Sequence, residues 1–195
     1  MLKAVRFPQL TLQQLDAPTQ ELAHEIIKIS KSGIGGPYNV LLRSPQLASK
    51  MKSLLDYLRF NTSLSLDLNE WAILIQARLW TCQIMWRSHL PLALKAGLPE
   101  HLPASLKRGE RPLNMSDKEA AVFDFCVQAA KNKKVSDEIF FKAKEILGEK
   151  PLVDLIAVSG TYVTIAMMLN LSCAPWPQGE EKPLDENSFN LECSQ

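Results

Sequence analysis

Glu70, Cys82 and His89 are the residues whose chemistry and spacing first suggest a reactive site in this chain. All three lie in the stretch 66–97, which reads LDLNEWAILIQARLWTCQIMWRSHLPLALKAG and is otherwise mostly apolar. An ionised carboxylate is costly in apolar surroundings unless a partner stabilises it. A carboxylate, a thiol and an imidazole together in such a stretch predict an acid–base site.

The spacing of these residues limits how they can meet. Cys82, Met85 and His89 are three and four residues apart, so they share one face of a helix. On one straight helix, Glu70 and His89 would be about 28 Å apart. We therefore expect either a break between them or a second subunit that supplies one of the pair. Thr81 is suited to cap a new helix beginning at Cys82, where the helix N-terminus would favour a thiolate.

The elements that must position this stretch are indicated by apolar residues at helical spacing. Capping boxes are suggested by Asp67 with Glu70 and by Ser116 with Glu119, and Pro91 should kink or interrupt its helix. No segment has a convincing strand pattern, so the sequence predicts an all-α protein. The expected helices are 20–32, 37–42, 45–60, one from about 68 to 97 with the breaks described, 99–108, 116–131, 136–147 and 151–171.

Length and composition indicate a single all-helical domain over 1–173, followed by a tail, 174–195, that is extended or disordered. Lys and Arg total 22 against 21 Asp and Glu, so the net charge is near zero. A nucleic-acid partner would require a basic surface, so none is expected. The four cysteines form no C-x-x-C pair, which argues against a disulfide framework and a zinc site. We expect no signal peptide and no membrane span, and hence a cytoplasmic protein.

The residues Glu70, Cys82, Met85 and His89 match E-x11-C-x2-C-x3-H, the signature of alkylhydroperoxidase D-like proteins, with Met85 in place of the second cysteine. The surrounding segments resemble the wider carboxymuconolactone decarboxylase family, and the resemblance covers about 35–171. It implies a helical bundle of antiparallel hairpins and a homo-oligomer of two, three or six copies. The segments that carry it are GPYNVLLRSPQLA, LNEWAILIQARLW, MWRSHLPLALKAGLP, LNMSDKEAAVFDFCVQAAKNKKVSDEIF and LVDLIAVSGTYVTIAMMLNL.

Met85 distinguishes between the branches that the resemblance offers. The peroxidase branch needs a second thiol to resolve a sulfenic acid, and a thioether cannot do this. The decarboxylase branch removes carbon dioxide from a carboxylated lactone without a metal or an organic cofactor, so the resemblance implies a small-molecule substrate and no cofactor. In that reading His89 donates or shuttles the proton, and Glu70 orients it.

The resemblance also implies a set of substrate-binding residues. Arg59 or Arg78 would hold a substrate carboxylate in a bidentate manner. Trp80 and Trp86 would form apolar walls. Cys82 would line the pocket, and Met85 and Asn39 complete the set.

Other interpretations of these residues stay open. The chain could be a peroxide reductase that uses Cys82 with a distant or external thiol. It could also be an assembly protein that kept the fold without the chemistry. Glu70 could serve only in a helix cap, Cys82 could be a small buried apolar residue, and the tryptophans could belong to the core.

Overall fold

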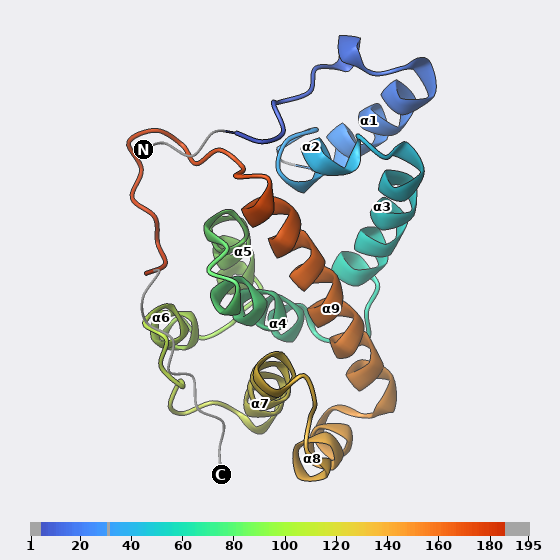
Figure 1. Cartoon of the computed structure of the whole chain (residues 1–195). Helices are drawn as coiled ribbons and strands as arrows, with labels where there is room; N and C mark the ends of the chain where they lie inside the picture. The colour runs from blue at the N-terminus through green and yellow to red at the C-terminus, as the bar shows by residue number, and fades with distance from the viewer. Residues whose placement is uncertain (1–4, 31, 186–195) are drawn as a thin grey trace.

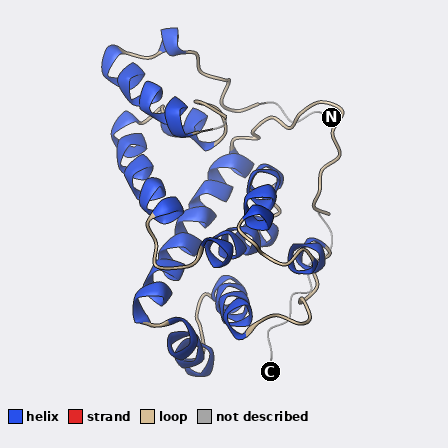
Figure 2. Ribbon diagram, turned by 180° about the vertical axis from the view of Figure 1, so that it is seen from behind, coloured by secondary structure: helices blue, strands red, loops and turns tan. Residues whose placement is uncertain are grey.

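The computed structural model describes residues 5–30 and 32–185, and within them the protein is all-α, as the sequence predicts. No strand occurs in this part of the chain. Figures 1 and 2 show the helices from opposite sides. After a short 3₁₀ turn at Leu12–Gln14, the helices are α1 (Ala17–Ile29), α2 (Pro37–Leu41), α3 (Pro45–Phe60), α4 (Leu66–Leu79), α5 (Gln83–Lys95), α6 (His101–Lys107), α7 (Asp117–Asn132), α8 (Asp137–Leu147) and α9 (Glu149–Leu171).

Helix α4 lies at the centre of the molecule (Figure 1). Every residue from Leu68 to Arg78 is buried, so α4 has no solvent-facing side over three turns. It packs against α5, α7 and α9, and its last turns also contact α6. A helix that is apolar around its whole circumference must be surrounded by other elements. Any polar side chain within residues 68–78 of α4 is therefore held in the interior.

Helix α9 is the longest element and runs past both α4 and α3 (Figure 1). Among the described residues it is the one helix that is long and apolar enough to cross a membrane by length and composition. Half of its most apolar window is buried inside the fold, and core helices of soluble proteins meet the same test. Near its start, Asp154 accepts hydrogen bonds from the amide and hydroxyl of Ser63 and from Tyr57. These bonds fix the loop that leads into α4.

The helix starts confirm two capping predictions and correct a third. Ser116 and Glu119 form the expected capping box at α7, and Ser136 caps α8. The box expected from Asp67 and Glu70 is wrong, because α4 begins at Leu66 and the Glu70 carboxylate is bonded elsewhere.

Pro91 does not interrupt its helix, because α5 continues through it to Lys95. Proline removes one backbone donor, which leaves the carbonyl four residues earlier without its usual intrahelical partner. The rest of α5 packs on α4 and holds the helix together across this position.

The two ends of the described chain lie against the helices in extended form. Before α1, the backbone of Phe7 and Leu10 is hydrogen-bonded to the Asn39 side chain. Beyond α9, Leu184 is buried and its backbone exchanges two hydrogen bonds with the Gln83 side chain. As far as Asp185 the tail is therefore non-helical and packed on the helices, while 186–195 lie outside the described residues.

Candidate active site

The helix break predicted near Thr81 is present and has a recognisable hydrogen-bond pattern. The amide of Cys82 bonds to the carbonyl of Ala77, and the amide of Thr81 bonds to the carbonyl of Arg78. This is a Schellman motif with Thr81 in the left-handed position, at φ +45°. A β-branched residue is strained there, since glycine is the usual choice. The new helix begins at Gln83, one residue later than expected, with Cys82 as its N-cap.

This turn brings Glu70 and His89 together within one chain. Glu70 lies eleven residues before Thr81 and His89 eight after it, so the two fall at similar depths when α5 folds back on α4. Nδ1 of His89 is 2.7 Å from Oε2 of Glu70. The Glu70 side chain is 7% exposed and the His89 side chain 12%. The alternative in which a second subunit supplies one of the pair is not needed.

The contact with the Glu70 carboxylate determines which imidazole nitrogen of His89 carries the proton. An ionised carboxylate can only accept, so the proton of the neutral ring lies on Nδ1 and Nε2 carries the free lone pair. No hydrogen bond to Nε2 is found among the described residues. Nε2 is also not among the polar side-chain atoms that are fully buried without a hydrogen-bond partner. Nε2 is therefore the nitrogen that can exchange a proton with a substrate, and Glu70 stabilises the imidazolium that results.

Tyr162 of α9 completes the surroundings of His89, and sequence reasoning did not single it out. Its ring meets the imidazole edge-on, with centroids 5.1 Å apart. Burial raises the pKa of the Tyr162 phenol well above its usual range, the charge of Arg59 partly offsets this, and the charge of Glu70 adds to it. The Tyr162 phenol therefore stays neutral. The available sequence signal was a single tyrosine among Val158, Ile165 and Leu169 on an otherwise apolar helix face.

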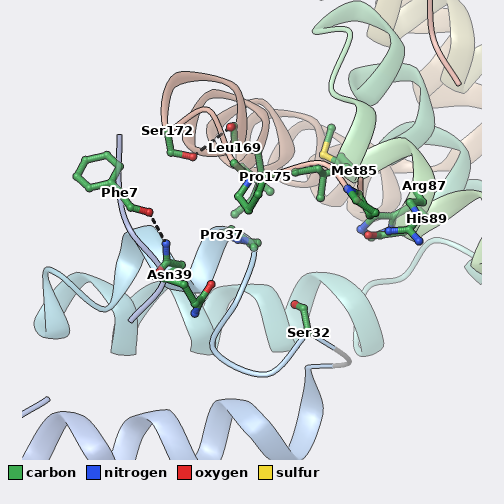
Figure 3. Close-up of a pocket in the computed structure, with 17 residues that line it drawn as sticks. Phe7, Ser32, Pro37, Asn39, Met85, Arg87, His89, Leu169, Ser172 and Pro175 are labelled. Atoms are coloured by element: carbon green, nitrogen blue, oxygen red, sulfur yellow. Dashed lines mark hydrogen bonds between the residues drawn. The ribbon is translucent and has the colours of Figure 1, made fainter. Parts of the chain in front are cut away.

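A cavity of about 290 Å³ lies beside this pair. Figure 3 shows Met85, Arg87 and His89 at one end, with Asn39 and Pro37 across from them and Leu169 and Pro175 between. The lining comes from the N-terminal segment, the loop before α2, helix α5, the end of α9 and the tail. Its residues are Phe7, Gln9, Ser32, Gly36, Pro37, Asn39, Ile84, Met85, Arg87, Ser88, His89, Ile165, Leu169, Ser172, Ala174, Pro175 and Pro177.

Two of the predicted substrate-binding residues, Met85 and Asn39, line this cavity. Met85 is 2% exposed and provides apolar wall one helical turn before His89. The Asn39 side chain is already bonded on both of its functional groups, since its oxygen accepts from the Leu10 amide and its nitrogen donates to the Phe7 carbonyl. Asn39 therefore holds the N-terminal segment over the cavity.

Cys82 lies outside this cavity lining and is 1% exposed. Burial raises the pKa of its thiol to about 11, although the amides of Met85 and Ile84 at the start of α5 pull it the other way. The expectation that the helix N-terminus favours a thiolate is therefore wrong, because desolvation outweighs the helix dipole at a sealed position. Cys126 is also buried and contacts the Ser159 hydroxyl.

The remaining predicted residues lie away from the cavity lining. Trp86 is buried, and its indole nitrogen has no hydrogen-bond partner among the described residues. Trp80 is 37% exposed and borders a different groove between α4, α7 and α9. Arg78 is 1% exposed and donates from Nε to the Lys107 carbonyl. Arg59 lies over the Phe60 ring, and its charge reaches the phenols of Tyr38 and Tyr162.

A metal centre is not indicated by the part of the chain that the structure describes. No group of three His, Cys, Asp or Glu side chains there is arranged to hold a metal ion. Compared with known proteins, the chain matches no protein-family model, and no curated protein matches its sequence. The arrangement itself defines the class of site: a buried carboxylate–imidazole pair that opens on a small, largely apolar cavity.

Proposed function

We propose that this protein is a cofactor-independent lyase of the carboxymuconolactone decarboxylase type, built on an alkylhydroperoxidase D-like bundle. Its substrate is a small carboxylated or lactone-like metabolite. The observation that carries the proposal is the 2.7 Å contact between Glu70 and His89 at the edge of a small cavity. At about 290 Å³, the cavity suits a small molecule, since ligand pockets begin at roughly that size.

The proposed reaction requires a place for one electron pair and a donor of one proton. Loss of carbon dioxide leaves the electron pair of the broken carbon–carbon bond on the substrate as a dienolate. Protonated His89 then donates its Nε2 proton to that carbon, and solvent restores the proton. Glu70 stabilises the imidazolium before the transfer. Ile84, Met85, Ile165 and Leu169 make the cavity apolar, which favours reactions that disperse charge.

The peroxide-reductase alternative is supported less well by the surroundings of Cys82. A peroxidatic cysteine must be accessible and ionised. Cys82 is 1% exposed, and burial raises its pKa to about 11. Met85 occupies the position of the resolving thiol and cannot form a disulfide.

The experiment is a panel of carboxylated lactones and unsaturated cyclic acids incubated with the protein in D₂O. The readouts are carbon dioxide release and deuterium at the carbon that lost the carboxylate. With an accepted substrate, we expect His89→Gln and Glu70→Gln to lower turnover by about 100-fold or more. His24→Gln is the matched control, because His24 is an exposed histidine on α1 far from the cavity lining.

Full turnover in both the His89 and the Glu70 variant would reject the assigned roles. Absence of turnover across the panel, in protein shown to be folded, would favour the reading as an assembly protein of this fold.

We also propose that the protein is a homo-oligomer. From Leu155 to Leu171, α9 carries no charged residue, yet Ile156 is 49% exposed and Leu171 57%. An uncharged exposed face of this length favours contact with another copy. Size-exclusion chromatography with light scattering should give a multiple of 21.9 kDa. Ile156→Lys should shift it toward the monomer, and Leu113→Lys, at an exposed apolar residue elsewhere, should not.

A further inference from the structure

Among the described residues that line the cavity, Arg87 and His89 are the two with ionisable side chains. Arg87, Ser88 and His89 are consecutive residues of α5, and all three line the cavity. A ligand held at Arg87 would therefore extend past Ser88 toward His89. Figure 3 shows Arg87 and His89 at the same end of the cavity.

The guanidinium of Arg87 is engaged by the tail of the chain itself. Its Nη2 is 2.9 Å from Oε1 of Glu180, and the group lies 5.5 Å from the centre of the Trp176 ring. The Trp176 indole in turn donates to the Glu180 carbonyl, which closes a compact turn around the pair. A carboxylate from the tail thus occupies the place where a ligand anion would bind.

The tail segment 174–183 is tied down on both sides of this contact. On one side it follows Ser172 and Cys173, and Ser172 is buried at the end of α9. On the other side, the Leu184 backbone makes its two hydrogen bonds to Gln83 at the start of α5. Between these two attachment points, Glu180 pairs with Arg87 of α5. The side chains of Arg87 and Glu180 are about half exposed, at 50% and 46%. The middle of the segment is therefore its most weakly held part.

We propose that Arg87 is the anion-binding residue of the cavity and that Glu180 is its internal placeholder, displaced when an organic carboxylate enters. Exposed ion pairs contribute little to stability, so exchanging one carboxylate for another on Arg87 costs little. Entry of the ligand releases the middle of 174–183 from α5, while the two ends stay attached. This assignment rests on the proposed function in one respect, because it takes the carboxylate that binds Arg87 to belong to the substrate.

The test uses benzoate as the probe and benzamide as its uncharged counterpart, both titrated into the full chain. The readout is the Trp176 indole N–H signal in ¹H–¹⁵N NMR, assigned with Trp176→Phe. We expect benzoate to shift this signal. Glu180→Gln should tighten benzoate binding by about three- to ten-fold, and Arg87→Gln should weaken it by about ten-fold or more.

The matched control is Glu181→Gln, which makes the same charge change at the neighbouring exposed residue of the tail. It should leave benzoate affinity as in the natural chain, and benzamide should respond to none of the variants. Equal benzoate affinity in Arg87→Gln and the natural chain would overturn the proposal. So would a Glu180→Gln variant that behaves as Glu181→Gln does, or benzoate binding in none of the proteins.

This binding test does not depend on turnover. If no substrate is ever turned over but the Arg87 and Glu180 variants respond as expected, the proposed lyase activity fails and the anion site stands.

Discussion

Cys82 and His89 lie on the same helix, seven residues apart and on nearly the same face, yet their surroundings differ completely. Cys82 is 1% exposed and lies outside the cavity lining, and burial raises its pKa to about 11. His89 borders a cavity and is held by Glu70 from α4 and by Tyr162 from α9. The comparison shows that the reactivity of a side chain on α5 depends on what the neighbouring helices place beside it.

The largest expected difference concerns the reactivity of Cys82 in the folded and unfolded protein. At pH 8, a rise in pKa from 9.0 to about 11 lowers the thiolate fraction by roughly 100-fold, and burial slows access further. Alkylation of Cys82 by iodoacetamide, followed by peptide mass mapping, should therefore be more than 100-fold slower in the folded protein. Rapid labelling, or a sulfenic acid at Cys82 after peroxide treatment, would restore the peroxide-reductase reading.

The next largest effect contrasts the two residues in turnover of a confirmed substrate. Cys82→Ala should retain activity within about three-fold, since the side chain does not line the cavity, whereas His89→Gln should lose about 100-fold. Steady-state rates of both variants under one set of conditions give the ratio. A Cys82→Ala variant that is folded and as inactive as His89→Gln would show that Cys82 is needed for turnover.

The smallest effect is on stability at alkaline pH. The folded state keeps the Cys82 proton up to a pKa of about 11, while the unfolded thiol ionises near 9.0. The unfolded state therefore binds fewer protons between these values, and the free energy of unfolding falls as pH rises through this window. The loss from Cys82 should be roughly 2 to 3 kcal/mol and complete above pH 11.

The Cys82 contribution can be measured by urea unfolding of the natural chain and of Cys82→Ala at pH 8, 9, 10 and 11. It is the difference between the two proteins in how the free energy of unfolding changes with pH. The contributions of Cys126 and Tyr162, which burial shifts in the same direction, cancel in the comparison. Parallel pH curves for the two proteins would mean that Cys82 is solvated in the native state.

Most of the helices could be predicted from local sequence alone. Ser116 with Glu119 and Ser136 mark helix starts because a short side chain caps a backbone amide within one turn. The break at Thr81 was also predictable, because Glu70 and His89 had to meet. The capping box predicted from Asp67 and Glu70 does not form, because the buried Glu70 carboxylate is bonded to His89 and not to a backbone amide.

The candidate site was predicted less completely than the fold. Glu70 and His89 were found from residue type and spacing, Met85 and Asn39 from the family resemblance, and the structure brings all four to or beside one cavity. Arg78 was misplaced as a cavity residue because its burial depends on α6, which is remote in sequence. Arg87 and Tyr162 were missed, since their contacts come from the tail and from α9.

The sequence by itself determined which chemical groups are available: one imidazole and one carboxylate at a spacing that requires a helix break for them to meet, and a thioether at Met85. Only the tertiary structure decided which side chains take part. Access to solvent, desolvation and the pairing of charges are set by segments far apart in the chain. For that reason Cys82 became a sealed neutral thiol, while His89 on the same helix acquired a partner and a cavity.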